Sequence, residues 1–273
     1  MKDLSKMLVV RELINSLHLI KKNAFWLVIA SLTDAVFLLA YGFFTTPVSE
    51  KIVEHSVLVA NKLSEVLAGK FPTGVLFKLF GPELRPLTLK LIMIILLLFL
   101  VIYLVYTVFQ ATSWYMATII AGKEYSYKQY LLGFARLNIL WMGGYLLYKI
   151  LDVILGLRYI IIRQIVPGAP NIAGKVLLAA FVFFALTALF SYPLLKAKTI
   201  FKTPWRISLA LTILCASIFL AAKFILDKIA YYGFMYYHTF TPAYVVGLLL
   251  LFPAITLIKV YATRVLSNVH AHN

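Results

Sequence analysis

Long apolar runs separated by short charged segments dominate this sequence. The longest run, residues 91–122, lies between Lys90 and Lys123 and holds 32 residues without a charge. A helix of that length spans roughly 48 Å at about 1.5 Å per residue, which exceeds the roughly 30 Å hydrocarbon core of a bilayer. The run therefore predicts a helix that crosses a membrane and extends beyond it.

Six such runs predict an all-α, polytopic integral membrane protein built as a six-transmembrane-helix bundle. The expected spans cover residues 24–44, 88–121, 131–155, 172–195, 208–226 and 242–260. The hydrophilic stretches between them are too short to bury a hydrophobic core of their own. We therefore expect residues 1–273 to form a single membrane domain.

Two further segments separate apolar and charged side chains at helical spacing. Residues 1–22 follow this pattern and predict an amphipathic helix on the inner membrane surface. Thr46 and Pro47 suit the N-cap and first turn of a second amphipathic helix, residues 48–67, on the outer face. Residues 45–88 would then cap that face, and residues 75–80 form either a short helix or a re-entrant piece.

The composition favours the membrane class. Hydrophobic residues make up 63% of the chain and charged residues 13%, against roughly 45–50% and about 25% in soluble domains. The net charge of +16 would also suit nucleic acid, but the basic residues lie beside apolar runs, where anionic lipid headgroups account for them. We therefore expect membrane lipids as partners, with anionic headgroups on the inner face, other membrane subunits as an alternative, and no nucleic acid.

The distribution of positive charge predicts the orientation. Thirteen Lys and Arg residues lie before the first span, in the loops after the second and fourth spans, and at the end of the last span, including Lys259 and Arg264. Short basic loops remain in the cytoplasm. We expect a multi-pass protein of the cell membrane with both termini cytoplasmic.

Ionisable residues inside the expected spans are the main functional candidates, because a charge at mid-bilayer costs about 2.5–3.5 kcal/mol. Asp34 lies near the middle of the first span, and Arg136 and Asn138 lie in the third. We expect Asp34 to face the bundle interior and to pair with Arg136 or, as a second choice, with Asn138. The pair is either structural or a substrate or proton site. Lys149 and Asp152, three residues apart, are expected to pair with each other.

Two features near the last span add candidates. Pro253 removes a backbone donor inside that span and predicts a kink, with a hinge as its functional interpretation. An aromatic cluster precedes the span and consists of Tyr231, Tyr232, Tyr236, Tyr237 and His238. It is typical of an aromatic belt at the outer interface or, alternatively, of a carbohydrate or lipid platform.

Common catalytic signatures are missing from the sequence. It has no nucleophile elbow, no zinc-protease helix motif, no phosphate-binding loop and no dinucleotide fingerprint. The single cysteine, Cys215, lies in an apolar run, which excludes an intramolecular disulfide and a cysteine-based metal site. His270 and His272 have no further ligands at suitable spacing. We therefore expect neither a cofactor nor a metal.

Three function classes follow. A permease-like protein that moves a small solute, ion or lipid is favoured by Asp34, Arg136, Asn138 and the kink at Pro253. A non-catalytic assembly or scaffold subunit of a membrane complex is the alternative, and a membrane-embedded lipid-modifying enzyme is the second alternative. A cavity at Asp34 would favour transport, a dry bundle would favour a subunit, and clustered carboxylates or histidines would favour an enzyme.

Overall fold

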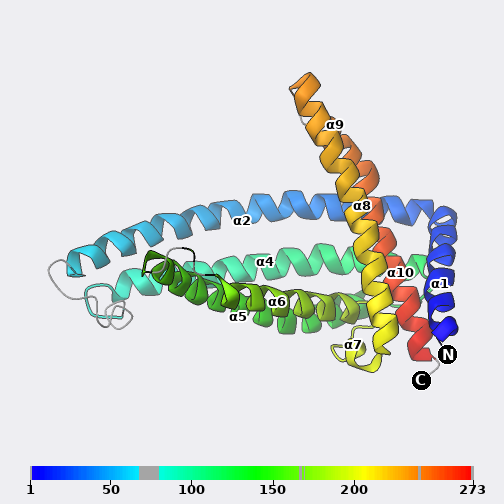
Figure 1. Ribbon diagram of the computed structural model, residues 1–273, viewed down its shortest axis with the longest axis horizontal. Coiled ribbons are helices and arrows are strands. Elements are labelled where there is room, and N and C mark those ends of the chain that lie inside the picture. The colour runs from blue at the N-terminus through cyan, green and yellow to red at the C-terminus, as the bar shows by residue number, and fades with distance from the viewer. Residues whose placement is uncertain (1, 68–79, 166–167, 169, 239–240, 272–273) are drawn as a thin grey trace. The chain divides into compact units, whose positions relative to one another are not determined.

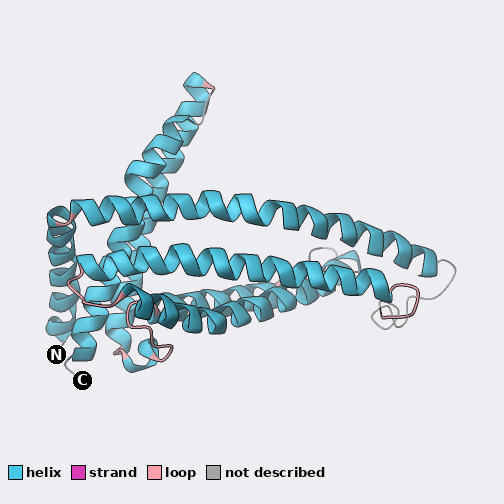
Figure 2. Ribbon diagram, turned by 180° about the vertical axis from the view of Figure 1, so that it is seen from behind, coloured by secondary structure: helices cyan, strands magenta, loops and turns pink. Residues whose placement is uncertain are grey.

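The computed structural model describes residues 2–67, 80–165, 168, 170–238 and 241–271, and their regular structure is helical (Figure 1, Figure 2). Five helices in these residues have the length and composition to cross a membrane: Ala24–Leu63, Arg85–Ile120, Ile172–Ser191, Trp205–Tyr236 and Leu249–Ala271. The chain is therefore an all-helical protein with the features of a multi-pass membrane protein. The helix over the predicted third span is not among the five.

The helices are longer than the predicted spans. They are α1 (Lys2–Lys22), α2 (Ala24–Leu67), α4 (Arg85–Ile120), α5 (Tyr127–Ile165), α6 (Ile172–Ser191), α7 (Thr199–Lys202), α8 (Trp205–Tyr237), α9 (Thr241–Val246), the π-helix η1 (Gly247–Leu251) and α10 (Phe252–Ala271). The predicted spans at 24–44 and 131–155 lie wholly within α2 and α5. The last predicted span ends inside α10, which continues to Ala271.

The predicted start of a separate helix at Thr46 and Pro47 is wrong, because α2 runs through Pro47 without a break. A proline removes one backbone hydrogen bond from a helix, whereas unwinding in hydrocarbon would leave several backbone groups without partners. The hydroxyl of Thr45 is satisfied within the same helix, where it donates to the Tyr41 carbonyl at 2.6 Å. Residues 75–79 of the predicted short segment lie outside the described residues.

The chain divides into two compact units. The smaller, Val36–Tyr106, contains the later part of α2 and the earlier part of α4. In this unit the rings of Phe37 and Tyr106 meet edge to face, with centroids 5.8 Å apart. The larger unit comprises Met1–Ala35 and Thr107–Asn273. All candidate site residues belong to the larger unit.

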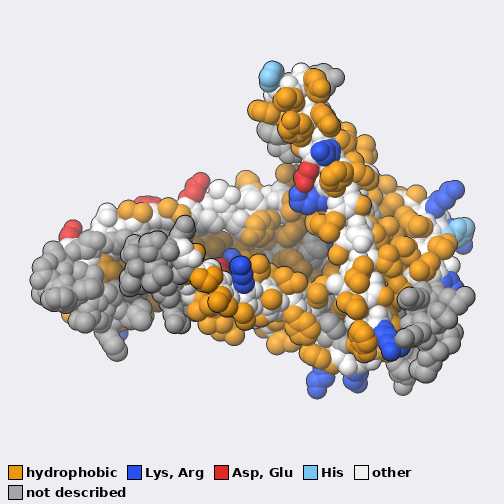
Figure 3. Space-filling model, viewed as in Figure 1, with side chains coloured by type: hydrophobic (Ala, Val, Ile, Leu, Met, Phe, Trp, Pro, Cys, Tyr) orange, Lys and Arg blue, Asp and Glu red, His pale blue; other side chains and the backbone are white. Residues whose placement is uncertain are grey.

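The helix α10 is the centre of the larger unit. It buries more than half of its most apolar stretch, whereas the other candidate membrane-spanning helices bury less than a quarter of theirs and place hydrophobic side chains at the surface (Figure 3). Its buried residues form a hydrophobic core with side chains from α1, α6 and α8: Val9, Phe190, Ile207, Leu211, Cys215, Ile258, Tyr261, Val265, Leu266 and Val269. In Figure 1, α1, α8 and α10 lie alongside one another and run across α5 and α6.

The predicted N-terminal helix is present as α1, but it docks on α10. Val9 and Glu12 are buried, whereas Leu17, one of the apolar side chains of this segment, is exposed. The Arg264 Nε donates to the Glu12 Oε2 at 2.8 Å, and the Tyr261 hydroxyl donates to the Val9 carbonyl at 3.2 Å. These contacts join the first helix of the chain to the last.

An irregular helical turn precedes α10 at the predicted kink. The Phe252 N–H donates to the Gly247 carbonyl, which is the longer spacing of a π-helix. Pro253 has no N–H to offer the Leu249 carbonyl, and its ring crowds that carbonyl. The wider π turn accommodates both effects. A hinge function for Pro253 stays a prediction.

The helices α5 and α6 pack closely at one glycine. A Cβ added at Gly144 would overlap the ring of Phe184, whereas a Cβ at the neighbouring Gly143 would meet nothing within 4 Å. The Phe184 ring lies edge-on to Trp141, with centroids 5.1 Å apart. The Trp141 Nε1 donates in turn to the Ser191 hydroxyl at 2.9 Å. The ring of Phe184 therefore packs between the Trp141 ring and the backbone at Gly144.

We predict that Gly144→Ala lowers the free energy of unfolding by about 1–3 kcal/mol, because Phe184 has to move in a packed site. Gly143→Ala is the matched control, and it should be neutral or should stabilise the helix by up to about 1 kcal/mol. Thermal unfolding of both purified variants in one detergent measures the difference. Equal stability of the two variants would contradict the close approach of α5 and α6.

Candidate functional site

Asp34 on α2 lies in a buried polar network with residues of α4 and α10. The side chains of Asp34 and Lys259 are almost fully buried, at 4% and 6% exposure. The Lys259 Nζ donates to both carboxylate oxygens of Asp34, at 2.8 and 2.9 Å. Gln110 Nε2 and Ser113 Oγ also donate to this carboxylate, at 3.1 and 2.9 Å. We call Asp34, Gln110, Ser113 and Lys259 the buried quartet.

Both neutral members of the buried quartet bridge the two charges. The Gln110 Oε1 accepts from the Lys259 Nζ at 3.0 Å, and the Ser113 Oγ accepts from it at 2.7 Å. Each of these side chains thus accepts from the ammonium and donates to the carboxylate. The Lys259 Nζ also lies 5.8 Å from the centre of the Trp114 ring. A buried ion pair is stable only when its remaining donors and acceptors are satisfied, and the quartet meets this condition.

The spacing of residues within each helix explains how the quartet assembles. Gln110 and Ser113 are three residues apart, so they share one face of α4. Ser31 and Asp34 have the same spacing on α2, and Thr256 and Lys259 have it on α10. The hydroxyls of Ser31 and Thr256 lie 3.4 Å apart, one turn from the ion pair. Matching polar faces therefore set the register between α2 and α10.

The predicted pairing of Asp34 with Arg136 is wrong. Arg136 is exposed, and Lys259 occupies the carboxylate. Lys259 was expected at the membrane interface, because the last span was predicted to end at residue 260. The helix α10 instead continues to Ala271, which places Lys259 in its first half and inside the protein.

Asn138, the second predicted partner of Asp34, belongs to a neighbouring network. Its Nδ2 donates to the Thr107 Oγ1 at 2.8 Å, and its Oδ1 accepts from the Tyr192 hydroxyl at 3.3 Å. The Tyr192 ring lies 5.9 Å from the Trp114 ring, centre to centre. Because Trp114 also contacts Lys259, the two networks are contiguous. They form one polar interior that joins α2, α4, α5 and α10.

Lys149 and Asp152 are both exposed, and the predicted pair between them is not formed in the described residues. The Lys149 Nζ lies instead 5.8 Å from the ring centre of Tyr145 and 5.5 Å from that of Tyr148. Long side chains on a helix lean toward its N-terminus. This direction carries the ammonium toward the preceding tyrosines and away from Asp152, and a cation gains a favourable contact there.

The outer aromatic cluster lies on the last turns of α8. Tyr231, Tyr232 and Tyr236 are exposed, and the rings of Tyr232 and Tyr236 stack with centroids 6.2 Å apart. His238 ends the helix in the left-handed conformation, at φ 50°. The side chain of Tyr237 lies outside the described residues. The cluster presents aromatic rings outward, as either predicted interpretation requires.

Sequence reasoning missed three members of the buried quartet. Gln110 and Ser113 interrupt the longest apolar run at a spacing of one helical turn, which is a signal for a shared polar face. Lys259 gave no such signal, because a lysine near the end of an apolar run is typical of an interface. Glu12 was likewise taken for a surface charge, although Arg264 holds it in the interior.

We predict that Asp34→Asn lowers the free energy of unfolding by about 3–5 kcal/mol, because it leaves the Lys259 ammonium buried without its counter-charge. Adding Lys259→Gln to this variant should restore part of the loss, because no buried charge then remains. The matched control is Asp227→Asn, which breaks the exposed pair with Lys223 and should change stability by less than about 1 kcal/mol. Thermal unfolding of all variants measures these effects, and equal losses at the two pairs would refute them.

No known protein family, curated protein or solved structure matches this chain. The chemistry of its own residues therefore carries any functional proposal. The buried quartet is the strongest candidate, because it holds a carboxylate and an ammonium inside an apolar helical protein.

Proposed function

We propose that this chain is a permease-like membrane protein that moves a small solute, ion or lipid, with Asp34 and Lys259 as its coupling pair. The observation that carries the proposal is the ion pair itself, which joins α2 to α10 in the protein interior. Ionisable residues are retained at such depth mainly where a protein handles ions, protons or charged groups.

The quartet offers two discrete states. When Asp34 is ionised, it holds Lys259, and the hydroxyl of Ser113 bridges the charges. Protonation of Asp34 would cancel the attraction and free the ammonium for an anionic substrate or for a new partner. A site of this kind couples a proton to a change in helix contacts.

The π-helix before α10 supplies a place where such a change can be absorbed. The turn Gly247–Leu251 ends two residues before Pro253, and Lys259 lies less than two turns beyond that proline. Hinges are short irregular segments that take up backbone change while the flanking elements stay rigid. We propose that α10 moves about this turn when the Asp34 pair opens.

The same proposal includes six spans with both termini in the cytoplasm and with α5 as the additional span. Support comes from the predicted inner segments, since Lys123, Lys196 and Ala271 line one cavity although they come from three different parts of the chain. The amphipathic helix α1 also lies on this proposed inner side, because its Glu12 pairs with Arg264 in the later half of α10. In Figure 1, α8 and α10 run crosswise to α5 and α6, so these two pairs of helices do not lie nearly parallel as neighbouring spans commonly do.

A scaffold or assembly subunit is the second candidate function. It is favoured by the complete pairing of the Asp34 and Lys259 side chains, which suits a fixed structural lock. It is also favoured by the apolar helices α4 and α6, which bury only 11% and 6% of their most apolar stretches and so leave surface for lipid or for other subunits.

Thiol accessibility separates the two functions without knowledge of a substrate. Ser31→Cys, in a Cys215→Ala background, places a thiol of similar size beside the buried quartet. In a permease, a charged membrane-impermeant thiol reagent should label this cysteine from at least one side of the membrane, and Asp34→Asn should change the rate at least about threefold. Leu211→Cys, in the apolar core, is the control and should stay unlabelled. If Ser31→Cys is also inert from both sides, with and without Asp34→Asn, the scaffold function is supported.

The orientation has its own test. Cysteines placed at the exposed positions Lys198 and Ile172 should be labelled from opposite sides of the membrane, with Lys198 on the cytoplasmic side. Intact cells and inverted vesicles, compared in the Cys215→Ala background, give the two readings. Labelling of both positions from one side would overturn the six-span arrangement.

A further inference from the structure

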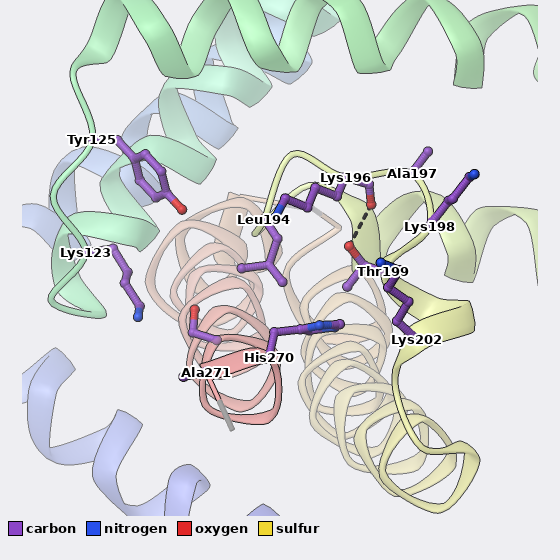
Figure 4. A pocket seen from close by; sticks show the side chains of 11 residues that line it. Lys123, Tyr125, Leu194, Lys196, Ala197, Lys198, Thr199, Lys202, His270 and Ala271 are labelled. Carbon is purple, nitrogen blue, oxygen red and sulfur yellow. Dashed lines mark hydrogen bonds between the residues drawn. The ribbon is translucent and has the colours of Figure 1, made fainter. Parts of the chain in front are cut away.

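A cavity of about 870 Å³ opens beside the last turns of α10 (Figure 4). Three separate parts of the chain line it: the loop before α5, the segment from the end of α6 through α7, and the end of α10. Its basic lining residues are Lys123, Lys196, Lys198, Lys202 and His270. No acidic residue is among the lining residues in the described part of the chain. The cavity therefore concentrates positive charge.

Figure 4 shows which of the basic side chains point into the cavity. In Figure 4 the Lys196 ammonium and the Tyr125 hydroxyl point toward one another across the opening, whereas Lys198 points away. The loop that carries Lys196 is fixed, because the Thr199 hydroxyl donates to the Lys196 carbonyl at 2.6 Å. The Nε2 of His270 lies 3.2 Å from the Thr203 hydroxyl, which also holds that ring in place. These hydrogen bonds hold the Lys196 backbone and the His270 ring in place at the cavity.

An unpaired hydroxyl gives an independent indication of a ligand. Ser267 lines the cavity, is 6% exposed, and its Oγ is buried without a hydrogen-bond partner in the described structure. Buried hydroxyls in folded proteins nearly always have a partner. Because this Oγ has almost no accessible surface, the Ser267 side chain would have to turn about χ1 to donate to an oxygen atom of an anion in the cavity, whereas the Lys196 side chain is already exposed.

We propose that this cavity binds a phosphate group, and that the phosphate belongs to the headgroup of an anionic phospholipid. Several lysines around one hydroxyl donor suit the charge and the many acceptor oxygens of a phosphate. The cavity is far larger than a single phosphate ion, and Leu194, Ala197 and Ala271 add apolar wall. This site is separate from the buried quartet, so it stands whether or not the chain is a permease.

Aromatic residues close in sequence to the lining residue Lys202 favour a lipid source for the phosphate. Phe201 and Trp205, which flank Lys202 and Arg206 in sequence, are 74% and 69% exposed. Exposed aromatic rings next to lysine and arginine are typical of the level of lipid headgroups. A headgroup bound there would bridge the loop before α5, the α7 segment and α10, and would stabilise their association.

Thermal unfolding of the full-length protein in a neutral detergent tests the site with three probes: cardiolipin, phosphatidylcholine and inorganic phosphate. Cardiolipin should raise the unfolding temperature, and phosphatidylcholine should not. The variant Lys123→Gln/Lys196→Gln should lose more than half of that shift. The control Lys21→Gln/Lys22→Gln removes the same charge from exposed positions outside the cavity and should keep it.

Ser267→Ala provides a second, milder variant. It removes an unpaired hydroxyl, so the lipid-free protein should be at least as stable as the parent, while the cardiolipin shift should fall. An equal shift with millimolar inorganic phosphate would keep the phosphate site but assign it to a soluble anion. Equal shifts in both double variants, an equal shift with phosphatidylcholine, or no shift with any probe would overturn the proposal.

Discussion

The ion pair between Asp34 and Lys259 is the constraint on which the larger unit depends. Two charges removed from water must stay together, and Gln110 and Ser113 make their separation still more costly by bridging both. This requirement fixes α2, α4 and α10 in one register. The pair between Glu12 and Arg264 adds α1 to the same helix. The hydrophobic core around α10 then fills the space that these polar contacts define.

The sequence predicted the helices well because hydrophobic length is a direct physical requirement of the bilayer. It did not predict that α2 continues through Pro47 as one helix. Pro47 resembles a helix start, yet it lies in mid-helix in α2, where the proline removes only one backbone hydrogen bond. Conversely, Pro253 was correctly expected to disturb its helix, and the π turn at Gly247–Leu251 is the form which that disturbance takes.

The sequence did not show which residue pairs with each buried acid. Arg136 was expected beside Asp34 because both lie inside predicted spans, but the carboxylate pairs with Lys259 of α10 instead. Lys259 and Arg264 also entered the count of inner positive charges, although buried acids neutralise both. A basic residue therefore informs on orientation only after its partners are known. Lys123 and Lys196 meet no such acid among the residues that line their cavity, and they keep their value for orientation.

The sequence separation within the ion pair has a consequence for biosynthesis. Asp34 and Lys259 are 225 residues apart, so at about 5–20 residues per second the ribosome makes the lysine roughly 10–45 s after the aspartate. During that interval the first apolar helix has to hold its acid protonated or near the headgroups. The larger unit therefore closes only when the last helix emerges, and a chain truncated before Lys259 would expose an unmatched acid to the membrane quality-control machinery.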